Sequence, residues 1–202
     1  MPTLKKPKPN NLFAPIGFVL LLFGGVLLLK LAWEPLKLET RYTLSRTINS
    51  PRPPLTPVNT DFSLVIEKIG AMAPIVQDVN SQDSGQYQRA LTRGIAHAAG
   101  TSLPGQGGNI FLFAHSSANP LDASRFNSVF YLVHHLEIGN EIQVWYQGQK
   151  HVYSVTSKRI VSPTDIAYLN PPSSDEQLTL MTCWPPGTTF KRLIVVAKPL
   201  AL

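Results

Sequence analysis

The feature that most constrains this chain is an uncharged, apolar segment near its N-terminus. Residues 12–29 contain no charged side chain and are mostly Leu, Val, Phe, Ile and Gly. This length is close to the minimum for a helix that crosses a bilayer. Lys30 can extend its amine to the interface, and Trp33 is typical of an interfacial anchor. We therefore predict a transmembrane anchor at residues 12–33, after a short basic cytoplasmic tail at residues 1–11.

A cleaved signal peptide is the alternative interpretation of the apolar segment. The segment is longer than the usual apolar core of a signal peptide, and residues 33–36, which read Trp-Glu-Pro-Leu, contain no small-x-small cleavage site. We therefore favour an uncleaved anchor. Lys5, Lys6 and Lys8 precede it, and this cluster indicates that the N-terminus lies inside the cell. The expected protein crosses the membrane once and has most of its chain outside.

The positive charge of the chain is unevenly distributed. The net charge is +6. Residues 1–60 contain eight basic residues (Lys or Arg) and two acidic ones (Asp or Glu), whereas residues 61–202 contain ten basic and ten acidic residues. The basic excess can therefore contact anionic lipid headgroups or an acidic wall polymer. Because residues 61–202 have no basic excess, we do not expect a nucleic-acid partner.

Residues 34–60 are predicted to be a linker. Residues 50–57 are rich in proline, which favours an extended and fairly stiff chain that would hold a folded domain away from the membrane. The folded domain is predicted to occupy residues 61–202.

This domain has the pattern of an all-β protein. Short apolar runs separated by Gly, Pro, Asn and Ser predict strands, and one segment near residues 128–136 predicts a helix. The predicted strands lie at residues 63–67, 74–79, 109–114, 142–146, 151–156, 177–182 and 192–197. About eight strands with few helices in ~140 residues indicate a β-barrel or a β-sandwich.

Cys183 is the only cysteine, so it cannot form a disulfide within the chain. A free cysteine is most often a small buried hydrophobic residue. The alternative is a nucleophile, which needs a thiolate, a basic partner and a donor for the oxyanion. Arg192 follows nine positions later, and in an antiparallel hairpin the Cβ atoms of the two residues could approach within ~5–6 Å. Arg192 could then stabilise an oxyanion, or instead form a solvated basic pair with Lys191.

The five histidines differ in their surroundings. His115 ends the most apolar predicted strand and precedes a loop, Ser-Ser-Ala-Asn-Pro, so it is the best candidate for a functional site. His97 lies in a turn-rich segment and could be structural, and His151 is predicted to lie on the exposed face of a hairpin strand. At least one of His134 and His135 is predicted to face solvent. One cysteine and scattered histidines lack the spacing of a metal site, so no metal is expected.

These residues together resemble the sortases, the membrane-anchored cysteine transpeptidases of bacterial cell surfaces. Residues 179–183, Thr-Leu-Met-Thr-Cys, fit the family's Thr-Leu-x-Thr-Cys signature, and the step of nine positions to Arg192 also fits. Upstream, residues 100–101 (Gly-Thr), 104–105 (Pro-Gly) and 108–109 (Gly-Asn) precede the strand that ends at His115, as in the family. The resemblance covers about residues 62–200.

The resemblance implies a fold and a mechanism. The fold would be an eight-stranded sortase-type β-barrel, all-β with a minor helix, behind a single N-terminal transmembrane helix. Cys183 would attack a Thr–Gly-type bond in a C-terminal sorting motif, commonly Leu-Pro-x-Thr-Gly, and form a thioester. An amine on a wall precursor or a pilin-like lysine would then take the product. His115 would protonate the leaving amine, and Arg192 would orient the substrate and stabilise the oxyanion. Substrate-binding residues would be Thr182, Trp184 and Pro185.

The chain departs from the family pattern in places. Ala114 replaces the usual Gly, and residues 116–117, Ser-Ser, replace the frequent basic residue after the histidine. No acidic cluster matches the calcium site of one family branch, and no cofactor is expected. Two alternatives stay open: an acyl-enzyme peptide hydrolase that uses water, and a non-enzymatic, membrane-tethered β-barrel binding module with an inert Cys183. The subclass also stays open.

Overall fold

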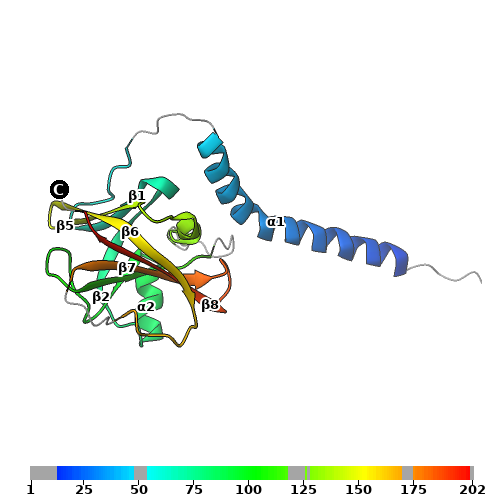
Figure 1. Ribbon diagram of the computed structural model, residues 1–202. Helices are drawn as coiled ribbons and strands as arrows, with labels where there is room; N and C mark the ends of the chain where they lie inside the picture. The colour runs from blue at the N-terminus through cyan, green and yellow to red at the C-terminus, as the bar shows by residue number, and fades with distance from the viewer. Residues whose placement is uncertain (1–12, 48–53, 118–125, 127, 170–174, 201–202) are drawn as a thin grey trace, which may run out of the picture.

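Eight strands close into a barrel in the computed structural model, which describes residues 13–47, 54–117, 126, 128–169 and 175–200. The strand order around the barrel is β1-β2-β3-β4-β7-β8-β6-β5. Figure 1 shows the barrel with α1 extending away from it. The strands are β1 (Phe62–Ile66), β2 (Ala71–Val79), β3 (Ile95–Ala98), β4 (Asn109–Phe113), β5 (Glu141–Tyr146), β6 (Gln149–Val161), β7 (Gln177–Trp184) and β8 (Lys191–Pro199). The helices are α1 (Phe13–Thr47) and α2 (Ser84–Leu91), with short 3-10 helices η1 (Glu67–Ile69) and η2 (Tyr131–His135).

The predicted eight-stranded β-barrel is confirmed, and all seven predicted strands are present. The hairpin between β5 and β6 turns at Gln147 and Gly148, which both have positive φ angles, of 48° and 79°. Two such residues form the type I′ turn that matches the twist of paired strands. The predicted helix at residues 128–136 is only the short η2.

Strand β3 and helix α2 were not predicted, nor was the short η1. Strand β3 has four residues and lies in a glycine-rich segment that resembles a turn, yet it pairs with β2 on one side and β4 on the other. Helix α2 was also missed. Its N-cap, Asp83, accepts a hydrogen bond from the Gln86 backbone N–H at 3.0 Å, which is a recognisable start signal in the sequence.

Helix α1 is longer than the predicted anchor. Residues 34–47 of the predicted linker are helical and continue α1 through Pro35. Residues rich in Leu, Lys and Glu favour helix over extended chain there. The predicted tail at residues 1–11 and residues 48–53, which include the start of the proline-rich segment, lie outside the described residues. No single helix in the described part is both long and apolar enough to span a membrane; Pro15–Lys30 and Pro35–Leu44 pass that test only as a pair bent by 45°.

Strand β4 lies at the centre of the arrangement that forms the site. All five of its residues are buried, as the continuous apolar run predicted. It runs parallel to β7, with Phe113 opposite Met181, and β7 runs antiparallel to β8. The C-terminal ends of β4 and β7 and the N-terminal end of β8 therefore meet at one edge of the barrel wall.

Candidate active site

Cys183 and Arg192 are direct neighbours across the β7–β8 pair. Their Cα atoms are partners in the ladder, one position before β7 ends and one position after β8 begins. The predicted cross-strand pairing is therefore confirmed. It follows from a hairpin whose connection is short enough to bring the end of one strand beside the start of the next.

His115 reaches the same edge from β4. Beyond the last ladder pair, the Ala114 backbone N–H donates to the Met181 carbonyl at 3.2 Å, so the parallel register continues past the strand end. The Thr182 hydroxyl donates to the Ala114 carbonyl, and the Ser116 hydroxyl donates to the Cys183 carbonyl, both at 2.8 Å. These bonds hold the segment around His115 against the end of β7.

One pocket of about 290 Å³ is lined by His115, Cys183 and Arg192 together. Its other walls come from β4, β7, the turn before β8, and the region of α2: Ser81, Tyr87, Gln88, Leu91, Phe113, Ala114, Met181, Thr182 and Thr189. The Tyr87 ring packs edge-on against Phe113, with centroids 6.4 Å apart. Helix α2, which the sequence analysis missed, therefore supplies one side of the pocket.

The sequence left two interpretations open for each residue. Cys183 could be a buried hydrophobic residue or a nucleophile, and Arg192 could stabilise an oxyanion or form a solvated basic pair with Lys191. Cys183 is half-buried and lines the pocket, so it is not enclosed in the core. Arg192 is also half-buried, whereas Lys191 is exposed. The Arg192 Nη1 donates to the carbonyls of Thr189 and Lys191, each at 3.1 Å. These bonds use one nitrogen of a guanidinium that carries five N–H donors.

The three predicted substrate-binding residues occupy different places. Thr182 lines the pocket, but it is almost fully buried and its hydroxyl is bonded to the Ala114 carbonyl. Trp184 and Pro185 are absent from the lining of this pocket. The Trp184 ring lies 5.5 Å from that of His134, and Pro185 is exposed in the turn after β7. Contact of these residues with a substrate stays a prediction.

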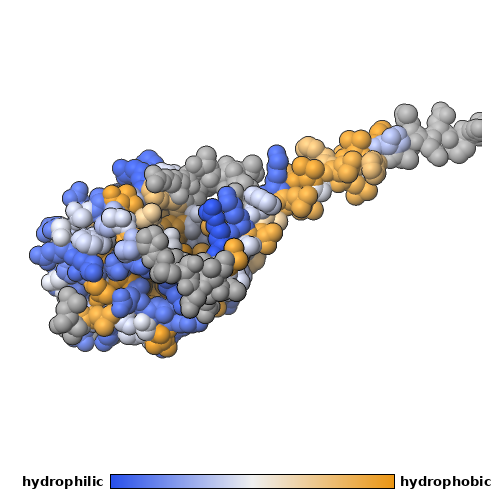
Figure 2. Space-filling view, turned by 90° about the horizontal axis from the view of Figure 1, so that it is seen from above, coloured by the Kyte–Doolittle hydropathy of each residue, from blue (hydrophilic) through white to orange (hydrophobic). Residues whose placement is uncertain are grey.

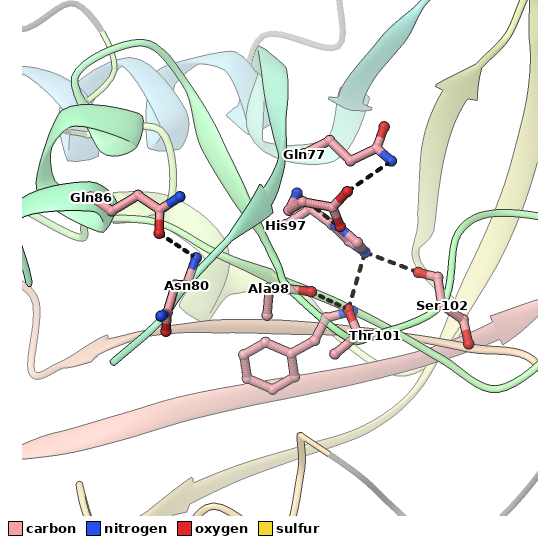
Figure 3. Close-up of polar contacts among 9 residues, drawn as sticks. Gln77, Asn80, Gln86, His97, Ala98, Thr101 and Ser102 are labelled. Carbon is pink, nitrogen blue, oxygen red and sulfur yellow. Dashed lines mark hydrogen bonds and ion pairs between the residues drawn. The ribbon is translucent and has the colours of Figure 1, made fainter. Parts of the chain in front are cut away.

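His97 is a structural residue, as one interpretation of the sequence held. It is fully buried on β3 (Figure 3), and its Nδ1 accepts a hydrogen bond from the Asp78 backbone N–H at 3.4 Å. The proton is therefore on Nε2, which donates to the Ser102 carbonyl at 3.0 Å, with the Thr101 hydroxyl also at 3.0 Å. Burial lowers the pKa of His97, against smaller opposing effects of the Ser102 bond and Asp78.

The other histidines are less exposed than predicted. His134 and His135 are both half-buried, with side chains 20% and 28% exposed, and both lie against Glu39 of α1. Burial also lowers the pKa of His134, as do His135 and Lys158, while the Tyr131 carbonyl and Glu39 raise it. His151 is partly buried on β6.

Cys183, His115 and Arg192 lie together at one edge of a closed β-barrel. Comparisons with known sequences and structures show which family has this arrangement. The sortase domain family matches residues 64–200, which is most of the chain. No curated protein matches the sequence. Sortase A from Corynebacterium diphtheriae, a lid mutant, is similar in structure, with a TM-score of 0.58 and 26% identity over 79% of this chain and 76% of that one.

Two further solved structures share the fold. Sortase C-1 from Actinomyces oris has a TM-score of 0.58 and 22% identity, over 82% of this chain and 99% of that one. The Clostridium perfringens Sortase D5 transpeptidase has a TM-score of 0.56 and 23% identity, over 85% and 96%. The chain belongs to the sortase family, whose members are cysteine transpeptidases associated with the cell surface.

Buried His97 should make folding stability depend on pH. Its neutral form is favoured in the folded state, so unfolded chains bind more protons once the pH falls below the ordinary pKa of ~6.5. The free energy of unfolding should therefore be fully retained above that pH and decrease as the pH falls below it. Urea denaturation of the full chain in detergent micelles measures this decrease.

The variant His97→Gln should be less stable at neutral pH but should show a smaller loss on acidification. The matched variant His151→Gln should keep the full pH dependence. An unchanged pH dependence in His97→Gln would contradict this prediction.

Proposed function

We propose that this sortase cleaves a C-terminal sorting motif similar to Leu-Pro-x-Thr-Gly in surface proteins and transfers the product to an amine. The observation that supports this most directly is the convergence of His115, Cys183 and Arg192 on one pocket. These are the residue types that nucleophilic acyl transfer needs: a thiol, a proton carrier and a cationic donor. The acceptor is an amine of a wall precursor or a pilin-like lysine.

In the first half-reaction, the Cys183 thiolate attacks the carbonyl carbon of the scissile Thr–Gly-type bond. A C–S bond forms, and the carbonyl oxygen becomes an oxyanion. The C–N bond then breaks, and His115 gives its proton to the departing amine, so that a neutral amine leaves and a thioester remains on Cys183.

In the second half-reaction, the acceptor amine attacks the thioester carbonyl. His115 takes a proton from the attacking nitrogen, and the C–S bond breaks to return the Cys183 thiolate. A new amide bond joins the surface protein to the acceptor. Arg192 acts in both half-reactions, because an oxyanion develops in each. The backbone carbonyls of Thr189 and Lys191 orient its guanidinium at the wall of the pocket. A preformed cationic donor is worth most where oxyanion charge develops.

Replacing the nucleophile should abolish transpeptidation. The full-length Cys183→Ala variant should form no thioester and no amide product from a fluorogenic Leu-Pro-x-Thr-Gly peptide library with added amines, as measured by mass spectrometry. The wild type should form the amine adduct in preference to the free acid. Retained product in the variant would contradict the proposal, and free acid alone, whatever amine is added, would identify the protein as a hydrolase.

Replacing the arginine should lower kcat/KM without disabling the thiol. We expect Arg192→Ala to lose about 10²–10³-fold, the usual effect of removing an oxyanion donor, and Arg192→Lys to recover only part of it. The rate of Cys183 alkylation by iodoacetamide should stay close to that of the wild type. The neighbouring variant Lys191→Ala is the control, and an equal loss in both variants would contradict a specific role for Arg192.

We also propose that the N-terminal half of α1 anchors the enzyme in the membrane, with the barrel outside. Large apolar side chains cover this half and are exposed (Figure 2), among them Ile16 at 52%, Leu21 at 76% and Leu29 at 72%. Each arginine placed at the centre of such a segment opposes insertion by ~2.5–3.5 kcal/mol.

The double variant Phe18→Arg and Leu21→Arg should therefore shift from the alkali-resistant membrane fraction to the supernatant. The control is Ile138→Arg with Ile166→Arg, two barrel positions that are 75% and 72% exposed. The control should stay in the membrane fraction with the wild type. Release of the wild type by alkali, or retention of the first variant, would contradict the anchor.

A further inference from the structure

Helix α1 meets the barrel at a cluster of one carboxylate and two imidazoles. The His135 Nε2 lies 2.9 Å from one Glu39 oxygen, and the His134 Nε2 lies 3.4 Å from the other. All three potential ligand atoms lie within 4.8 Å of one another. Among the described residues this is the one group of His, Cys, Asp and Glu with such spacing. Glu39 and His135 are 96 positions apart, so sequence spacing could not have revealed it.

The hydrogen bonds of His134 leave a lone pair facing the carboxylate. Its Nδ1 lies 2.9 Å from the Tyr131 carbonyl oxygen, which can only accept, so Nδ1 carries the proton. In the neutral ring, Nε2 then has a lone pair that points toward a negatively charged oxygen. Two lone pairs at 3.4 Å repel each other unless a proton or a metal ion lies between them.

The geometry suits a transition-metal ion. With metal–ligand distances of about 2.0–2.1 Å and tetrahedral angles, neighbouring ligand atoms are about 3.3 Å apart. The His134 and His135 Nε2 atoms lie 3.4 and 2.9 Å from separate oxygens of the Glu39 carboxylate, which is close to this value, and a bound ion would replace the 2.9 Å hydrogen bond of His135. An Nδ1–H bonded to a backbone carbonyl is also the usual support for a histidine that ligates through Nε2.

We propose that Glu39, His134 and His135 bind a divalent first-row transition-metal ion, such as zinc, which fastens α1 to the barrel. Two histidines and one glutamate form a common zinc ligand set with one position left for water. The side chains are 35%, 20% and 28% exposed, so an ion can reach them from solvent. This site is separate from the pocket of the proposed transpeptidase.

The surrounding contacts keep the ligands in place. The Tyr42 ring stacks on His135, with centroids 4.1 Å apart and planes inclined by 20°. The Lys158 ammonium donates to the carbonyls of His134 and Leu136 at 2.8 and 2.7 Å and so fixes the backbone of η2. The positive charge of Lys158 disfavours a bound cation. Its ammonium group is, however, held at the backbone carbonyls of His134 and Leu136 by these two hydrogen bonds.

The site also lies close to the edge of the barrel where β4, β7 and β8 meet at the proposed active site. The His134 ring lies 5.5 Å from that of Trp184, which directly follows Cys183 in β7. A metal ion on His134 would restrict the motion of the His134 imidazole beside Trp184. It would also hold α1 next to the end of β7.

Zinc titration of the full chain in detergent micelles tests the site. The background is Cys183→Ala, because Cys183 and His115 could themselves bind zinc. Calorimetry with zinc chloride should give one ion per chain, and Glu39→Gln and His134→Gln should each weaken binding by about tenfold or more. The matched variants Glu141→Gln and His151→Gln should bind as the parent does.

Hydrogen exchange separates a fastening site from incidental binding. Zinc should slow amide exchange in residues 35–44 of the parent, and the slowing should disappear in His134→Gln. Absence of zinc binding, or equal binding in all four variants, would overturn the proposal. Zinc binding that depends on Glu39 and His134 but leaves exchange unchanged would overturn the fastening of α1. Neither result depends on whether the chain transfers peptides.

Discussion

The parallel pairing of β4 with β7 is the constraint on which the site depends. Side chains alternate between the two faces of a strand, so a slip of one residue would turn His115 away from Cys183. Two hydroxyls extend the register beyond the ladder, from Thr182 to Ala114 and from Ser116 to Cys183. Both bonds join a side chain of one segment to a carbonyl of the other, so together they oppose such a slip.

Two departures from the family pattern, at Ser116 and Ala114, lie within this register. Ser116, where sortases frequently have a basic residue, donates to the Cys183 carbonyl and is almost fully buried, at 2% exposed. A charged side chain there would lose its hydration. Ala114 is buried too, and its N–H and carbonyl both bond to β7. The two residues therefore serve the packing of the strand ends.

The parts that could be predicted are those with local signals. Strands such as β4 and β7 were found because apolar runs ended at Gly, Pro or Asn. Strand β3 was missed because its identity as a strand comes from β2 and β4 on either side, which single-sequence patterns do not contain. Helix α2 does have a local signal, because the Asp83 side chain caps its N-terminus. Residues 34–47 of the predicted linker are helical because most of them favour helix over extended chain, and Pro35 lies inside the helix.

The sequence by itself determined the pairing of Cys183 with Arg192, since a hairpin with a short connection brings its ends together whatever the remaining chain does. It also identified His115 as a polar residue at the end of a buried strand. Only the tertiary structure decided that α2 walls the pocket, that His97 is buried, and that Glu39 meets His134 and His135. These contacts join segments far apart in the chain, and they form only when the barrel closes and α1 packs against it.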